Sequence, residues 1–202
     1  MGKFIGLTGN FGCGKSTVAH MFEECGAAII DADKLNAEIL QNDKSIQKKL
    51  ITCFGKTIED PNGSINKQKL AELLFSSKAN KKKAEDILHP AIRKLAQAQA
   101  DNYFKLGKKV VIFEAALIIE SRFHKQLDGL ILVTCDSKIE SERFNQNPEK
   151  QKLAKFYDHI IASQMSQEEK KNFTPWIIDN SKGRDHTQEQ VKKIWSQYIL
   201  RN

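Results

Sequence analysis

One eight-residue motif near the N-terminus constrains the fold more than any other feature of the chain. The run Gly9–Ser16 reads Gly-Asn-Phe-Gly-Cys-Gly-Lys-Ser and fits the phosphate-loop spacing G-x-x-x-x-G-K-S without a mismatch. The apolar stretch Phe4–Thr8 precedes it, and apolar residues at helical spacing follow it. Such a strand, glycine-rich turn and helix N-terminus direct backbone N–H groups and the positive end of the helix dipole toward phosphate oxygens. The motif therefore predicts nucleotide binding, with Lys15 at the β- and γ-phosphates and the Ser16 hydroxyl as a Mg²⁺ ligand.

Beyond the motif, short apolar runs alternate with longer amphipathic ones. This alternation is typical of a parallel sheet covered by helices on both faces. The expected strands are Phe4–Thr8, Ala27–Asp31, Lys109–Glu114, Leu130–Cys135 and Trp176–Asp179. Capping-box spacing at Ser166/Glu169 and Thr187/Gln190 predicts two helix starts. The fold class expected is a P-loop NTPase α/β protein, a three-layer α/β/α arrangement around a five-stranded parallel sheet.

Two regions stand outside this alternation. Residues 34–108 read as mostly helical, interrupted by Asp60-Pro61-Asn62-Gly63 and by His89-Pro90, after which a new helix is expected to start. Residues 145–172 are polar. We interpret the first region as a helical substrate-side insertion and the second as a lid. With a core of 1–33, 109–144 and 173–202, the whole chain of 202 residues is interpreted as a single P-loop domain.

Two carboxylates, Asp31 and Asp33, lie at the carboxyl end of the second expected strand. The carboxyl edge of an open α/β sheet faces the ligand crevice. If the backbone stays extended there, both side chains project to the same side, and one can accept the proton of an attacking hydroxyl. Alternatively, one of them caps the next helix, which is a common role of aspartate. The residues alone leave both roles open.

Several segments, taken together, resemble the dephospho-coenzyme A kinase family. The family's G-x-x-G-x-G-K-S-T loop corresponds to Gly9–Thr17, and its glycine followed by D-A-D corresponds to Gly26–Asp33. Its His-Pro-x-Ile-Arg element matches His89–Arg93 in full, and its P-L-L-x-E element resembles Ala116–Glu120 with the proline replaced. Near the C-terminus the family has a Gln, a Glu-Glu-Lys run and an Ile-Asp-Asn element, matched by Gln164, Glu168–Lys170 and Ile178–Asn180. The resemblance covers nearly the whole chain.

The resemblance implies transfer of the ATP γ-phosphoryl group to the ribose 3′-hydroxyl of dephospho-CoA, the final step of coenzyme A synthesis, with Mg²⁺. It implies that Asp33 is the catalytic base and that Lys15 is also catalytic. The residues then expected to bind ATP are Gly9, Gly12, Cys13, Gly14, Lys15, Ser16, Thr17, Arg143 and Asn180. Those expected on the dephospho-CoA side are Asp31, Asp33, His89 and Arg93, although the proline after His89 also allows a purely structural corner there. Ser16 is the expected metal ligand.

The lid departs from the family pattern. Where the family usually carries two arginines, this chain has Asn147 and Ile160. Arg143, Lys150, Lys152 or Lys155 can supply positive charge there, but lysine lacks the fork geometry of a guanidinium. Two alternatives therefore stay open beside the leading one. The chain can be another P-loop metabolite or nucleoside monophosphate kinase, or a nucleotide-binding protein with impaired catalysis.

Composition limits the partners. The net charge of +7 suits a polyanionic small substrate, and the sequence contains no zinc-finger spacing and no RNA-binding signature, so no nucleic-acid partner is expected. The four scattered cysteines predict reduced thiols. No apolar run is long enough for a signal peptide or a membrane span. A cytoplasmic enzyme without an obligate protein partner is expected.

Overall fold

A computed structural model of the protein describes residues 2–146 and 156–199. By internal contacts the chain forms two compact units, residues 1–31 with 99–202 and residues 32–98. The first unit contains the whole sheet and the phosphate-loop motif, and the second is helical.

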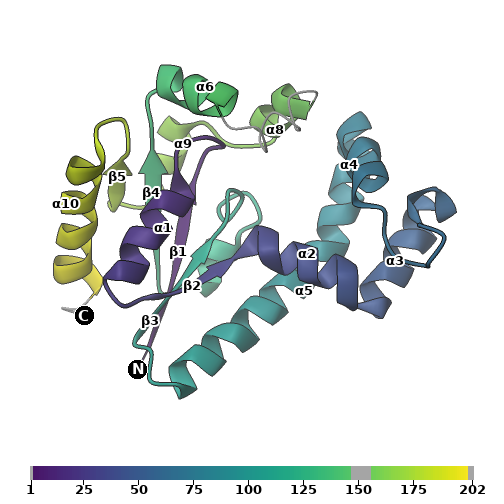
Figure 1. The fold of residues 1–202 in the computed structure, drawn as a ribbon, viewed down its shortest axis with the longest axis horizontal. Helices are drawn as coiled ribbons and strands as arrows, with labels where there is room; N and C mark the ends of the chain where they lie inside the picture. The colour runs from purple at the N-terminus through teal and green to yellow at the C-terminus, as the bar shows by residue number, and fades with distance from the viewer. Residues whose placement is uncertain (1, 147–155, 200–202) are drawn as a thin grey trace. The chain divides into compact units, whose positions relative to one another are not determined.

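The first unit is built on a five-stranded parallel sheet, as the sequence predicts. Its strands are β1 (Lys3–Gly9), β2 (Ala28–Asp31), β3 (Val110–Glu114), β4 (Gly129–Thr134) and β5 (Ile177–Asp179). They lie in the order β2-β3-β1-β4-β5, so β1 is central (Figure 1). The five expected strands are confirmed to within one residue at each end. Because all strands run the same way, the chain segments that follow them meet at one edge of the sheet.

One face of this sheet is covered by α1 (Lys15–Glu24) and α10 (Arg184–Ile194), which pack against each other and against the strands (Figure 1). Their apolar stripes join alternate strand residues in one core, and a π-helical turn, Trp195–Ile199, extends α10. On the other face, the rings of Phe4, Phe113 and Phe123 meet edge to face. The described part of the unit also contains α6 (Ser137–Gln146), α8 (Tyr157–Ala162) and α9 (Gln167–Lys171).

The second unit consists of α2 (Ala32–Asn42), α3 (Lys44–Phe54), α4 (Lys67–Ser76) and most of α5 (Lys78–Lys105). Its helix starts follow local chemistry. The Asp43 carboxylate accepts the backbone N–H groups of Ser45 and Ile46, and the Asn66 side chain accepts that of Lys69. Its apolar residues form a core of their own, separate from that of the sheet.

Three sequence expectations about helices have different outcomes. The Ser166/Glu169 capping box is confirmed, with both reciprocal hydrogen bonds present at the start of α9. The expected Thr187/Gln190 box is wrong, because α10 begins at Arg184 and both residues lie inside it. The expected break at His89-Pro90 is also wrong: α5 runs through both residues without interruption for 28 residues. His89 is therefore part of a helix and not a corner.

The four cysteines are all free thiols, as expected, with Cys13 and Cys135 buried. Within residues 2–146 and 156–199, no helix combines the length and the apolarity needed to cross a membrane.

The burial pattern predicts the cost of opening the core of the first unit. Leu7, in the central strand, is 0% exposed, whereas Leu106 is 71% exposed. Leu7→Ala should lower the free energy of unfolding by about 2–5 kcal/mol, because it removes buried methyl groups and leaves a cavity. Leu106→Ala is the matched control and should change it by less than about 0.5 kcal/mol. Urea unfolding followed by circular dichroism measures both, and equal effects of the two variants would contradict the assigned core.

Candidate phosphate-loop site

The phosphate loop is held in shape by backbone geometry that only its glycines adopt easily. β1 ends at Gly9, and α1 begins at Lys15. Between them Gly12 has a φ of 92° and Gly14 a φ of 85°, both in the left-handed region. The carbonyl oxygen of Asn10 accepts the Cys13 N–H (3.3 Å) and the Lys15 ammonium (3.2 Å), which closes the turn. The N-terminus of α1 is thereby directed into the loop, in the arrangement that binds phosphate.

Two side chains, those of Asn180 and Arg143, contact the carbonyl oxygen of Cys13. The Asn180 Nδ2 donates to it at 2.8 Å, and an Arg143 nitrogen lies 3.5 Å from it. Arg143 also donates to the Asn180 carbonyl oxygen (3.0 Å), and the Thr187 hydroxyl donates to Asn180 Oδ1 (2.9 Å). A Cβ atom on Gly14 would overlap Asn180 Nδ2. The two residues predicted to bind ATP from outside the motif therefore contact the loop directly, through its backbone.

The Cys13 side chain belongs to the core and not to the ligand side of the loop. It is fully buried among the residues of β1, β4 and α1. Burial raises the pKa of its thiol above the ordinary value, with the Lys15 charge opposing this effect. A buried thiol with a raised pKa holds its proton and is a poor nucleophile.

A carboxylate that the motif analysis did not assign lies next to Ser16. Glu114 ends β3 and is 8% exposed, and its Oε1 accepts the Ser16 hydroxyl at 2.7 Å. Strand pairing sets Glu114 beside Asp31 of β2 and Leu7 of β1. Its position in the sequence could have identified Glu114 as a site residue, since a carboxylate at the carboxyl end of a buried strand lies at the ligand edge of such a sheet. Asp31 and Glu114 are thus brought together at this edge.

This group of oxygen atoms fits a magnesium ion that arrives with a nucleotide. Within the described part of the chain, no cluster of three or more His, Cys, Asp and Glu side chains forms a metal site. Mg²⁺ does not require one, because it keeps several waters and binds through one or two protein oxygens plus substrate phosphates. The Ser16 hydroxyl and the Glu114 carboxylate are donors of the right kind.

Another carboxyl group, that of Glu140 on α6, lies near the loop. A Cβ atom on Gly12 would be 3.5 Å from that of Glu140, and the Gln167 side chain donates to Glu140 Oε1 at 3.2 Å. Burial raises the pKa of Glu140, while the positive charges of Lys15 and Arg143 oppose the rise.

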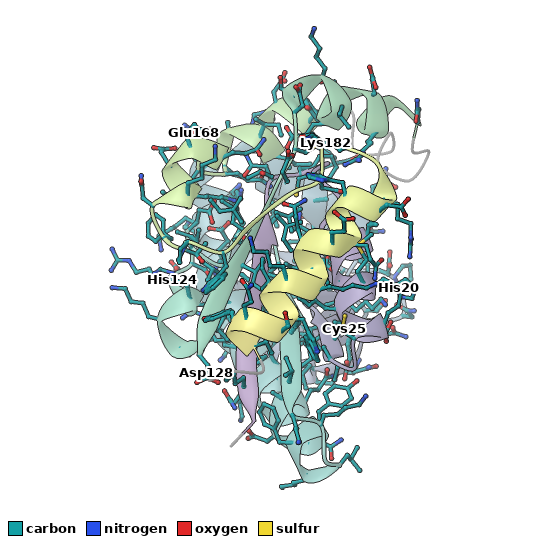
Figure 2. All side chains as sticks on the ribbon, turned by 90° about the vertical axis from the view of Figure 1, so that its left-hand side faces the viewer. His20, Cys25, His124, Asp128, Glu168 and Lys182 are labelled. Carbon is teal, nitrogen blue, oxygen red and sulfur yellow. The ribbon has the colours of Figure 1, made fainter. Side chains whose placement is uncertain are left out.

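The segment after residue 156 also contacts the loop. The Gln164 Oε1 accepts the Phe11 backbone N–H at 3.0 Å, and the ring of Phe11 meets the ring of Tyr157 edge to face. Glu168 on α9 and Lys182 after β5 lie at the same end of the sheet, opposite to Asp128 before β4 (Figure 2). Loop, α9 and the turn after β5 therefore gather at the carboxyl edge of the strands.

Of the expected lid residues, Asn147, Lys150, Lys152 and Lys155 lie outside the described residues. Ile160, expected from the sequence to stand in place of a second family arginine, lies in α8.

The three residues expected on the acceptor side, apart from Asp31, belong to the helical unit. Asp33 is exposed in the first turn of α2, which begins at Ala32 directly after β2. The backbone is therefore not extended at Asp33, contrary to the condition under which Asp31 and Asp33 would project together. His89 and Arg93 lie four residues apart on α5, on one helix face. Burial lowers the pKa of His89 below the ordinary value, with Glu85 opposing this and Arg93 adding to it, so the neutral imidazole is favoured at neutral pH.

Comparison with known proteins gives one consistent family. A family model described as dephospho-CoA kinase matches residues 3–186. Dephospho-CoA kinase of Aquifex aeolicus is 35% identical over 195 residues, covering 96% of this chain and 97% of the relative. That of Listeria innocua is 31% identical over 202 residues, covering 98% of each. Two solved structures match at 26% identity over 98% of this chain: a Thermus thermophilus protein (TM-score 0.77, 98% of that chain) and a dephospho-CoA kinase from Campylobacter jejuni (TM-score 0.68, 97% of that chain).

The loop geometry generates a prediction at Gly14. Gly14→Ala should weaken MgATP binding at least about tenfold, because the new Cβ must displace the Asn180 amide from the Cys13 carbonyl as well as accept a left-handed backbone. Gly107→Ala is a matched control with almost the same φ, 86°, and no atom within 4 Å of its Cβ. Isothermal titration with MgATP, with a thermal melt of each variant, separates the two effects. Equal loss of affinity in both variants would contradict the role given to the Asn180 contact.

Proposed function

The chain belongs to the dephospho-CoA kinase family, and we propose that it transfers the γ-phosphoryl group of ATP to the ribose 3′-hydroxyl of dephospho-CoA. The observation that carries the proposal is the family match over residues 3–186, which includes the phosphate loop, Glu114, Arg143 and Asn180. The products are ADP and coenzyme A.

On the donor side, the roles follow from the loop. The backbone of Gly12–Ser16 and the N-terminus of α1 hold the β- and γ-phosphates, and Lys15 exchanges its contact with the Asn10 carbonyl for phosphate oxygens. Mg²⁺, when bound with ATP, neutralises charge that builds on the phosphate oxygens during transfer. Ser16 would be a ligand for it, and Glu114, which accepts the Ser16 hydroxyl, would orient that ligand.

On the acceptor side, Asp33 accepts the proton of the 3′-hydroxyl as that oxygen forms its bond to the γ-phosphorus and the bond to the leaving ADP oxygen breaks. Arg93 binds an anionic group of dephospho-CoA with its planar fork, and neutral His89 offers a hydrogen bond rather than a charge.

The charge distribution along the chain supports a substrate-binding role of the helical unit. Residues 32–98 hold 13 of the 32 Lys and Arg but 8 of the 25 Asp and Glu, so five of the seven net positive charges lie in the helical unit. A positive unit raises the local concentration of a polyanionic substrate.

A nucleotide-binding protein without transfer activity is the second candidate, and Ile160 supports it. In other phosphoryl-transfer enzymes, an arginine that contacts the transferred group is worth about 10³–10⁵ in rate. Isoleucine supplies no charge for that purpose.

A coupled ADP-release assay distinguishes the two. Wild-type protein with MgATP should release ADP only when dephospho-CoA is present, with mass spectrometry detecting addition of one phosphoryl group. Shikimate and nucleoside monophosphates serve as control acceptors and should give no turnover. MgATP binding without acceptor-dependent release would favour the second candidate.

The base assignment predicts a selective loss of turnover. Asp33→Asn should lower kcat by about 10²–10⁴ with little change in MgATP affinity, because an amide cannot take the hydroxyl proton. Glu38→Gln makes the same chemical change at another exposed position of α2 and should be silent. Lys15→Ala should remove nearly all activity by losing the phosphate contact. Unchanged turnover in Asp33→Asn would exclude a base at this position and leave Asp33 a role in the start of α2.

The carboxylate at the end of β3 predicts a different phenotype. Glu114→Gln should raise the Mg²⁺ concentration needed for half-maximal rate by about 10–100-fold at fixed ATP, because the Ser16 hydroxyl loses its anionic partner. A magnesium titration of the steady-state rate measures this shift. A lower rate at an unchanged magnesium requirement would mean that Glu114 does not act through the ion.

A further inference from the structure

The phosphate-loop unit contains a charged side chain that no part of the proposed mechanism uses. Lys170 of α9 is 0% exposed. Its ammonium donates to the Ala116 carbonyl oxygen at 3.0 Å and forms an ion pair with Glu120 Oε1 at 3.1 Å. The same Ala116 oxygen accepts the hydroxyl of Thr8, the residue before Gly9 in β1. A buried lysine therefore shares a hydrogen-bond acceptor with β1, the strand that leads into the phosphate loop.

Glu120 extends this contact toward the loop itself. Its Oε1 also accepts the Met165 backbone N–H at 2.9 Å. The preceding residue is Gln164, whose side chain holds the Phe11 N–H. Glu120, paired with Lys170, thus holds the backbone at Met165. The neighbouring Gln164 in turn holds the Phe11 amide of the loop. Tyr157, against the Phe11 ring, contacts the same loop residue from α8.

The pair is a costly arrangement if stability is its only purpose. Burial lowers the pKa of Lys170, which Glu120 opposes, and the Lys15 charge lowers it further. Glu120 Oε2 is buried with no hydrogen-bond partner among the described residues. Replacing such a pair by apolar residues is often neutral or stabilising, so a buried ion pair is weak evidence for a role in stability alone. The contacts of the pair instead lead to the phosphate loop, through Met165 and Gln164.

We propose that Lys170 and Glu120 are positioning residues for ATP, which hold Gln164 in place so that it fixes the Phe11 amide and the first half of the phosphate loop. The inference rests on the proposed function for the identity of the nucleotide. It assigns a role to three residues that match family motifs, Gln164, Glu120 and Lys170, and it makes the contact between the 157–171 segment and the loop part of the ATP site.

A double-mutant cycle tests the coupling. Gln164→Met removes the acceptor of the Phe11 N–H, and Lys170→Met removes the buried charge at nearly constant length. Each should weaken MgATP binding by about five- to tenfold, the size of one lost hydrogen bond. Because both act through the same contact, the double variant should bind about as Lys170→Met does, and not about 25- to 100-fold more weakly than wild type. The KM for dephospho-CoA should stay within about twofold in all three.

Lys171→Met is the matched control, since Lys171 is the next residue of the same helix and forms an exposed pair with Glu168. It should leave MgATP binding unchanged. If Lys170→Met does not fold, as judged by its thermal melt, Glu120→Gln replaces it in the cycle, because it keeps the shape and removes the charge.

Titration calorimetry with MgATP alone measures the cycle, so its result does not depend on turnover. Independent, multiplying effects of the two substitutions would overturn the proposal, as would wild-type MgATP affinity in Lys170→Met or an equal loss for both substrates. Failure of wild-type protein to phosphorylate dephospho-CoA would instead overturn the proposed function and leave the cycle interpretable.

Discussion

The carbonyl oxygen of Cys13 is the contact on which the phosphate loop depends. A loop that directs N–H groups toward a ligand must direct carbonyl groups elsewhere, and a buried carbonyl without a donor is costly. Here the closer of the two donors is Asn180, whose amide nitrogen donates to the Cys13 carbonyl while its amide oxygen accepts the Thr187 hydroxyl. Asn180 follows the carboxyl end of β5, and Thr187 lies on the buried side of α10. These two elements therefore stabilise the shape of a loop that lies 167 residues earlier in the chain. A substitution on α10 can reach the nucleotide without touching it.

Charge around the loop is arranged in layers. Lys15 lies on the ligand side, Arg143 on the Asn180 and Cys13 carbonyls, and Lys170 within the core. Each cation has a nearby acceptor or carboxylate, so none is buried without compensation. The half-buried Glu140 lies among the same charges. Burial raises the pKa of its carboxyl group, and the positive charges of Lys15, Arg143 and Lys170 oppose this rise without overcoming it. In the proposed ATP complex, the polyphosphate would meet positive charges that the protein has already oriented, and fixed charges of this kind lower the cost of binding.

Sequence patterns predicted the sheet well and some of the helix boundaries poorly, for separable physical reasons. A buried parallel strand is a short apolar run, so the ends of all five strands were predictable to within one residue. The break at His89-Pro90 was expected because proline lacks an N–H, yet α5 continues through it. Local preference was overridden there by a 28-residue helix whose buried residues, Leu88, Ala96 and Ala100 among them, lie on both sides of the proline. Thr187 and Gln190 have the spacing of a capping box, but their side chains bond Asn180 and the backbone of Asp179.

The same distinction separates what was predictable in the site from what was not. A motif specifies residue types at fixed offsets, so the loop between β1 and α1 was predictable from sequence, and the roles of Lys15 and Ser16 stay predictions. It does not specify partners that lie far away along the chain. From sequence, Glu114 is the last residue of a predicted strand and Lys170 belongs to the Glu168–Lys170 run of a polar region. The contact of Glu114 with the Ser16 hydroxyl and the complete burial of Lys170 are seen only in the structure. Two adjacent lysines of α9 therefore have opposite environments: Lys170 is buried against Ala116 and Glu120, whereas Lys171 pairs with the exposed Glu168.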